Sequence, residues 1–186
     1  PDHVDAQLQL IIHTSEGKPD EQLPAFQKLK ETAGDVLEQK GYFKEGTGSF
    51  WTMLETRPYV RVCYAYFDTL FSCGMIRRAI YEGKNLIKLC EDDNLGIRYQ
   101  LMHLYAYMED ELNALALHKQ YDCLEEARML LPLAVLYYKL NRFDEAREYI
   151  IRLAAANKDT KQFFRAAAND QLEHSFAAMD PVGYQP

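Results

Sequence analysis

The sequence predicts an all-α protein built from consecutive pairs of helices, and three observations support this. Apolar residues recur at helical spacing along most of the 186 residues. The seven prolines and nine glycines fall mostly between these periodic segments, where helices end. No long stretch alternates apolar with polar residues as a half-buried strand would.

Two predicted helices, 3–13 and 20–40, precede the part of the chain that repeats. The second carries apolar residues three and four positions apart, which is the pattern of a helix that buries one face. The residues that we expect to face inward are Leu23, Phe26, Leu29, Val36 and Leu37. We expect these helices to form a cap that covers the exposed apolar side of the first helix pair.

A short helix is predicted at 47–54, and the segment "KEGTGSFW" leads into it. Two glycines surround Thr47, but the segment lacks the Lys-Ser or Lys-Thr ending and the preceding strand of a phosphate-binding loop. We expect a flexible turn before Trp51, which anchors the cap to the first helix pair.

Six further helices form three pairs, at 57–73 with 76–90, 95–108 with 111–120, and 124–140 with 143–156. The turns within the pairs, "CGMIRRA", "YMEDELNA" and "KLNRFDEA", end at Ala79, Ala114 and Ala146. These alanines lie 35 and 32 residues apart, which brackets the period of about 34 residues of a tetratricopeptide repeat. Small residues here let the second helix of a pair lie close to the first.

The pairs also depart from a regular repeat. Gly83 and His118 stand where a bulky apolar residue of the second helix is usual, and Phe67 and Met102 where a small residue of the first is usual. We therefore expect packing angles that are not standard. Within 124–140, we favour a continuous but bent helix through Pro132 over a split near Leu130.

The segment "EDDNLGIRY" begins the helix at 95–108. Asp92, Asp93 and Asn94 fit an N-cap region, where acids are favoured by the helix dipole and where we expect Asn94 to accept a backbone N–H. Gly96 in the first turn lets another backbone come near. Arg98 borders the apolar face, and we expect an ion pair with an acid of the neighbouring repeat.

The length and the ordinary balance of 48% hydrophobic and 26% charged residues fit one domain. We predict cap helices at 1–46, a repeat core at 47–157, and a capping helix (159–178) with a tail at 158–186. The predicted fold is a right-handed α-α superhelix of about three degenerate tetratricopeptide-like helix pairs with an N-terminal helical cap.

The 21 Lys and Arg against 28 Asp and Glu give a net charge of -7, which disfavours sequence-independent binding to nucleic acid phosphates. No apolar run reaches the roughly 18 residues of a membrane span, and no signal peptide is recognisable. The four cysteines lack the spacing of a zinc site, so we expect them to be reduced and mostly buried. Together these features predict a soluble, cytoplasmic protein.

Three segments resemble tetratricopeptide-like proteins related to the suppression-of-tumorigenicity family and its bacterial relatives: "FWTMLETRPYVRV", "DDNLGIRY" and "LLPLAVLYYKLNRFDEA". In that group a Thr-Arg-Pro-Tyr segment precedes a helix pair and an Asp-Asn-x-Gly-Ile-Arg-Tyr segment opens the next. The resemblance covers about residues 47–157 and implies a helical-repeat fold that mediates contacts, with no established chemistry. The matching residues are Arg57, Pro58, Tyr59, Asp93, Asn94, Gly96, Ile97, Arg98 and Tyr99.

The first helices of stacked pairs line a concave groove, and we predict that this groove binds a peptide or a partner protein. Tyrosine and arginine concentrate binding energy in such surfaces, although several of the 13 tyrosines can equally fill space between helices. The residues predicted to line the groove are Arg61, Tyr64, Asp68, Tyr99, His103, Tyr107, Arg128, Val135 and Tyr138.

No nucleophile with a neighbouring base is recognisable, and we predict neither a metal site nor a cofactor. One alternative is an enzyme, or its accessory domain, with an anion-recognising pocket around Arg57, Tyr59, Arg98 and Tyr99. Arg98 held by an acid favours the interaction module, whereas unpaired, converging arginines favour the pocket. A second alternative is a subunit that self-associates into a homo-oligomer through exposed apolar residues of its C-terminal helix, namely Phe163, Phe164, Leu172 and Phe176.

Overall fold

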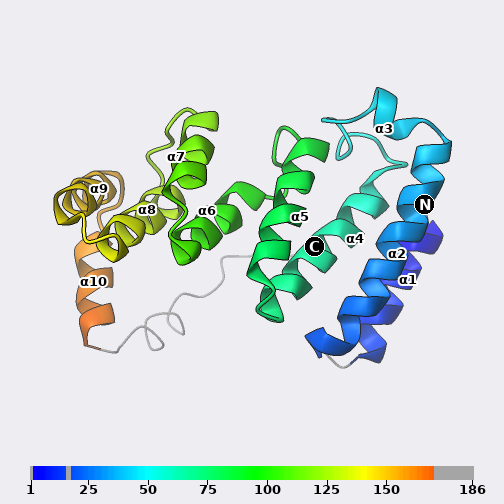
Figure 1. The fold of residues 1–186 in the computed structure, drawn as a ribbon, viewed down its shortest axis with the longest axis horizontal. Helices are drawn as coiled ribbons and strands as arrows, with labels where there is room; N and C mark the ends of the chain where they lie inside the picture. Colours follow the sequence, from blue (N-terminus) through cyan, green and yellow to red (C-terminus); the bar gives the residue numbers. More distant parts are fainter. Residues whose placement is uncertain (1, 16–17, 170–186) are drawn as a thin grey trace. The chain divides into compact units, whose positions relative to one another are not determined.

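The chain is all-α, as predicted, in a computed structural model that describes residues 2–15 and 18–169 (Figure 1). Over that part of the chain the backbone forms helices and turns, with one isolated antiparallel bridge between Ser49 and Cys90. The helices are α1 (Asp2–Thr14), α2 (Pro19–Gln39), α3 (Tyr42–Glu45), α4 (Arg57–Ser72), α5 (Ile76–Leu89), α6 (Ile97–Met108), α7 (Glu111–Gln120), α8 (Ala127–Lys139), α9 (Phe143–Ala156) and α10 (Thr160–Ala168).

The helices are distributed over two compact units. Unit 1, residues 1–104, contains α1 to α5 and the first turns of α6. Unit 2, residues 105–186, contains the end of α6 and α7 to α10. No described helix in either unit has the length and apolar character needed to cross a lipid bilayer.

The helix predicted at 47–54 is wrong. This segment forms turns, and a shorter helix, α3, precedes it. Gly48 has a φ of 102°, which favours glycine and interrupts a helix. The backbone around it pairs with the end of α5, since Phe50 N–H donates to the Leu89 carbonyl and Glu91 N–H donates to the Gly48 carbonyl. A tertiary contact with α5 therefore decides the conformation here.

Helix α4 forms the centre of unit 1. Helices α1, α2 and α5 all pack against it, and it is buried around most of its circumference, as expected for a helix that is apolar on several sides. The cap helix α2 buries Phe26, Leu29 and Leu37, as predicted, and leaves Leu23 half-buried. The prediction for Val36 is wrong, because 46% of its surface is exposed.

The turns within the three helix pairs share one geometry. Gly74, Glu109 and Asn141 each end the first helix with a positive φ, of 70°, 58° and 59° respectively. In each turn the next N–H donates at 2.9 Å to the carbonyl five residues before it, which is the bond of a Schellman motif. These bonds join Met75 to Leu70, Asp110 to Tyr105, and Arg142 to Tyr137.

The aligned alanines occupy the same place after each turn. Ala79, Ala114 and Ala146 are each the fourth residue of the second helix, and all three are buried, with 0%, 0% and 4% of their surface exposed. In the pairs α4–α5 and α8–α9, which pack together, the small side chain therefore lets the second helix approach the first.

Two of the departures from the regular repeat compensate each other. A methyl group placed on Gly83 would lie 2.8 Å from Leu101 Cδ2 and 3.1 Å from a ring carbon of Phe67. The large Phe67 in α4 thus occupies space that the missing side chain of Gly83 in α5 leaves open. The large residue in α4 and the small one in α5 together keep the core filled.

Pro132 is buried inside the continuous helix α8, so the predicted continuity is confirmed. The proline lies in the second turn, where only the carbonyl of Arg128 loses its helical partner. The last helix, α10, begins at Thr160, and its Phe163 and Phe164 are half-buried with their rings 5.4 Å apart. Leu172, Phe176 and the predicted helix end at 178 lie outside the described residues.

Candidate functional site

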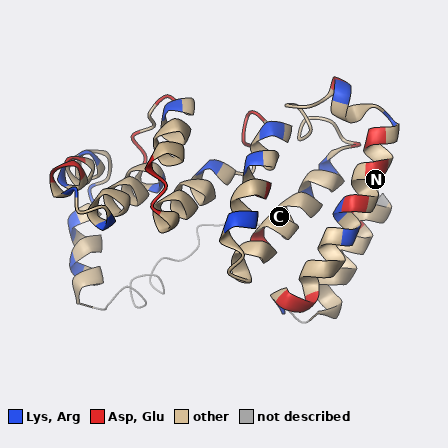
Figure 2. Ribbon diagram, in the orientation of Figure 1, with Lys and Arg blue, Asp and Glu red and all other residues tan. Residues whose placement is uncertain are grey.

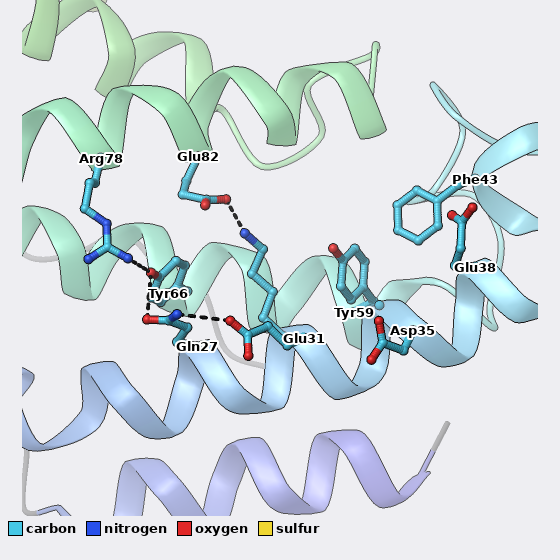
Figure 3. A pocket seen from close by; sticks show the side chains of 11 residues that line it. Gln27, Glu31, Asp35, Glu38, Phe43, Tyr59, Tyr66, Arg78 and Glu82 are labelled. Atoms are coloured by element: carbon cyan, nitrogen blue, oxygen red, sulfur yellow. Dashed lines mark hydrogen bonds and ion pairs between the residues drawn. The ribbon is translucent and has the colours of Figure 1, made fainter.

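A cleft in unit 1 gathers charged and aromatic side chains and is the candidate site. Helices α2 and α5 lie on either side of α4 and enclose a cavity of about 420 Å³ (Figure 3). A second cavity of about 300 Å³ adjoins it, and the two share the side chains of Lys30, Phe43, Tyr59 and Glu82.

The floor of the cleft is one face of α4. Tyr59, Cys63 and Tyr66 recur at four and three residues and therefore project to the same side of the helix. Phe43 of α3 closes one end, and its ring meets that of Tyr59 edge-on at a centroid distance of 5.7 Å. Aromatic rings thus supply most of the apolar surface of the cleft.

An ion pair between Lys30 of α2 and Glu82 of α5 bridges the cleft at 2.5 Å. The side chains are only 20% and 11% exposed, and the Lys30 ammonium lies 5.1 Å from the centre of the Tyr66 ring. A buried pair of this kind is costly to disrupt, because removal of one partner leaves the other charge uncompensated.

The outer wall of the cleft is acidic. Glu31, Asp35 and Glu38 lie on one side of α2 and are exposed at the rim. Figure 2 shows red segments, which mark Asp and Glu, along α2. Glu31 accepts a hydrogen bond from Gln27 at 3.0 Å, whereas Asp35 and Glu38 form no ion pair with any described residue. The rim therefore presents negative charge to the solvent.

Neutral and cationic side chains line the opposite end of the cleft. Arg78 donates to the Tyr66 hydroxyl, which in turn donates to the side-chain carbonyl of Gln27 at 3.5 Å. The Arg78 guanidinium also lies 6.0 Å from the centre of the Tyr66 ring. This chain of contacts fixes Tyr66 and links all three helices.

Two ionisable groups of the floor, Cys63 and Tyr59, are held in their neutral forms. Burial raises the pKa of the Cys63 thiol to about 12, although the Lys30 charge opposes this shift. Burial also raises the pKa of Tyr59 far above the ordinary value of a phenol. Neither group is therefore ionised near neutral pH. The floor is suited to binding a ligand, and these two groups are not activated as nucleophiles.

The predicted groove residues of α4 lie on the face opposite the cleft. With about 3.6 residues per turn, Arg61, Tyr64 and Asp68 project away from the floor residues. Arg61 is paired with Asp5 of α1, and its Nε donates at 2.8 Å. The cap thus reaches this face too, which the sequence did not indicate.

Two predicted groove residues of α6 lie in unit 1. His103 is exposed, whereas Tyr99 is buried with only 8% of its surface accessible. The Tyr64 hydroxyl accepts a hydrogen bond at 3.3 Å from Gln100, which joins the predicted groove faces of α4 and α6 within this unit.

The remaining predicted groove residues lie in unit 2. Tyr107, Arg128, Val135 and Tyr138 are all exposed. The Lys139 ammonium lies 5.5 Å from the centre of the Tyr107 ring. Tyr138 meets Phe143 at a ring distance of 5.5 Å, so this unit displays aromatic side chains of its own.

Asp93, and not Asn94, caps α6. The Asp93 carboxylate accepts hydrogen bonds from the backbone N–H groups of Ile97 and Arg98 at 2.7 and 3.0 Å, whereas Asn94 is exposed. A φ of 48° at Asp93 and of 69° at Gly96 shapes this turn. Burial raises the pKa of Asp93 even though its N–H donors favour the charged form.

Arg98 is held by this same carboxylate at 3.0 Å and stacks on Tyr99 at 4.4 Å. One partner of Arg98 is therefore an acid of its own loop, because the turn brings Asp93 back over the first turn of the helix. Arg57, whose neighbour Pro58 lies in the first turn of α4, donates to the Trp51 carbonyl at 2.5 Å. Both motif arginines thus have acceptors.

The sequence analysis identified only Tyr59 among the residues that line the cleft. A signal was present, because Lys30 lies in line with the apolar residues Phe26, Ala33 and Leu37 of α2. Glu82 likewise interrupts the buried face of α5. A charged residue within an apolar helix face indicates a buried ionic partner, but not which one.

The chain matches no protein-family model, no curated protein and no solved structure. Among the residues that the structure describes, no three His, Cys, Asp or Glu side chains gather to hold a metal ion. The cleft is therefore interpreted from its own chemistry.

Proposed function

We propose that this protein is a non-catalytic, tetratricopeptide-like interaction module that binds a peptide segment of a partner protein, with the cleft of unit 1 as a principal docking site. The observation that carries the proposal is an open cavity of about 420 Å³ with an aromatic floor and a charged rim. Rigid aromatic side chains beside charged groups concentrate binding energy at low cost in conformational entropy.

Two further observations support the proposal. The three helix pairs repeat one turn geometry and one buried alanine, which is typical of helical-repeat scaffolds. Arg57 and Arg98 have acceptors within unit 1, which is the arrangement expected of an interaction module. The predicted groove face on α4 and α6 remains a second candidate surface of the same module.

Site-specific photo-crosslinking in an extract of the source cells tests this proposal. Asp35 and Glu38 at the rim are replaced one at a time by p-benzoylphenylalanine, and Val36 serves as the matched control. Val36 is exposed on the same helix but does not line the cleft. We expect one protein to be crosslinked through both rim positions and not through Val36.

Equal crosslinking through Val36, or none through either rim position, would contradict the cleft as a docking site. The crosslinker at Asp68, on the opposite face of α4, separates the two candidate surfaces. A protein captured there, and not at the rim, would move the docking site to the predicted groove face.

A further inference from the structure

We infer that the cleft of unit 1 receives a cationic side chain, an arginine of a basic peptide segment. The inference rests on the proposed function and names the chemistry of the partner. It starts from the end of the cleft where Asp35, Glu38, Phe43 and Tyr59 lie together (Figure 3).

The cations of the cleft are already engaged at its other end. Lys30 is paired with Glu82, and Arg78 donates to the Tyr66 hydroxyl. Four carboxylates line the cavity against these two cations: Glu31, Asp35, Glu38 and Glu82. A surplus of negative charge therefore remains, and it lies at the end formed by Asp35 and Glu38.

The aromatic rings at this end have the chemistry that a cation requires. Lys30 and Arg78 both lie within about 6 Å of the Tyr66 ring centre, so the cleft already holds cations against an aromatic face. No described cation occupies the corresponding place at Phe43 or Tyr59. Phe43, Tyr59 and the two carboxylates thus supply the aromatic and anionic groups that bind a cation.

Gly34 lets the Tyr59 ring pack closely against α2 at this end of the cleft. A methyl group at this position would lie 3.3 Å from a ring carbon of Tyr59. A larger residue at this position would press on the ring that lines this end of the cleft.

The charge and shape of the site distinguish between possible side chains. An acidic side chain would be repelled by Asp35 and Glu38, and an apolar one would remove water from these carboxylates without replacing their hydrogen bonds. A guanidinium is planar, stacks on aromatic rings and donates forked hydrogen bonds to carboxylates. Arginine therefore fits this end of the cleft best.

The test is a titration of the full chain with the peptide acetyl-Gly-Arg-Gly-Arg-Gly-amide, followed by NMR. The same peptide with citrulline in place of arginine is the ligand control, because citrulline keeps the shape and loses the charge. Shifts of the Gly34 amide report on the cleft, and those of Gly74 report on a position outside it. We expect arginine-dependent shifts at Gly34 that weaken with added salt.

The double variant Asp35→Asn/Glu38→Gln is expected to bind the arginine peptide roughly fivefold more weakly. Both side chains are exposed at the rim, so the fold is retained, which circular dichroism verifies. The double variant Glu55→Gln/Asp92→Asn removes the same charge from exposed positions outside the cleft and is expected to bind like the wild type.

Three results would overturn the inference: equal binding of the citrulline peptide, equal losses in both double variants, or no shift at Gly34. Any of these combined with specific crosslinking through Asp35 and Glu38 would leave the proposed function intact and reject only the basic ligand. The absence of rim crosslinking would instead reject the docking site itself.

Discussion

The two units use the same kinds of side chain in networks that differ in burial. In unit 1, Lys30 and Glu82 meet over Tyr66, with side chains 20% and 11% exposed. In unit 2, Arg142 pairs with Glu111 over Tyr137, with side chains 42% and 33% exposed. The first network spans a cleft between helices that pack on a common neighbour, whereas the second lies at a surface turn.

The difference in burial gives the two networks different energetic roles. Solvent screens the exposed pair and compensates for its loss. The buried pair has no such compensation, so its charges depend on one another. A cation, a carboxylate and a tyrosine thus depend strongly on one another in the first network and only weakly in the second.

The largest expected effect is that of Glu82→Gln in unit 1. We expect a loss of about 2 to 4 kcal/mol in the free energy of unfolding, because Lys30 is left buried without its counter-charge. Urea unfolding followed by the fluorescence of Trp51 measures this, since the only tryptophan of the chain lies in unit 1.

The double variant Lys30→Met/Glu82→Leu is the control for this prediction. It removes both charges, and we expect it to recover most of the stability that the single variant loses. A double variant that is as unstable as Glu82→Gln would show that the shape of the side chains matters and their charge does not.

Gly83→Ala is expected to have the next largest effect. The added methyl group would overlap with Leu101 and Phe67, and we expect a net loss of about 1 to 2 kcal/mol after the gain in helix propensity. Thermal unfolding of unit 1, again followed through Trp51, measures it. Adding Phe67→Leu should restore part of the loss, and an unchanged or stabilised Gly83→Ala variant would refute the compensation.

A substitution in the exposed network of unit 2 should have a smaller effect on stability. For Glu111→Gln we expect a loss in the free energy of unfolding that is much smaller than that of Glu82→Gln. This loss should vanish in 1 M NaCl, where the Debye length is about 3 Å. Hydrogen exchange at the amides of α8 and α9 measures it. A salt-insensitive loss as large as that in unit 1 would remove the distinction between the networks.

The smallest expected effect is a pH dependence of the stability of unit 2. The hydrogen bond from Arg152 lowers the pKa of Glu125, so the folded state favours the charged carboxylate. This contribution is present above the ordinary glutamate pKa of about 4.3 and is lost as the pH falls through the lowered value. Glu125→Gln should remove this part of the acid sensitivity in unfolding curves collected between pH 3 and 6.

Much of the helical architecture follows from the sequence, because local periodicity, caps and turns are encoded by neighbouring residues. The errors arise where distant parts of the chain meet. The segment 47–54 forms turns because it pairs with the end of α5. Val36 is exposed because α2 packs on α4 with a narrower face than its apolar pattern suggests.

The sequence by itself determined the helix pairs, the turns that join them and the buried alanines that follow, since these depend on interactions a few residues apart. Only the tertiary structure decided which charges meet. Lys30 and Glu82 are separated by 52 positions, and Asp35, Glu38, Phe43 and Tyr59 come from three helices. Side chains so far apart in the chain become one site only when α2 and α5 pack against α4, and local periodicity carries no information about that packing.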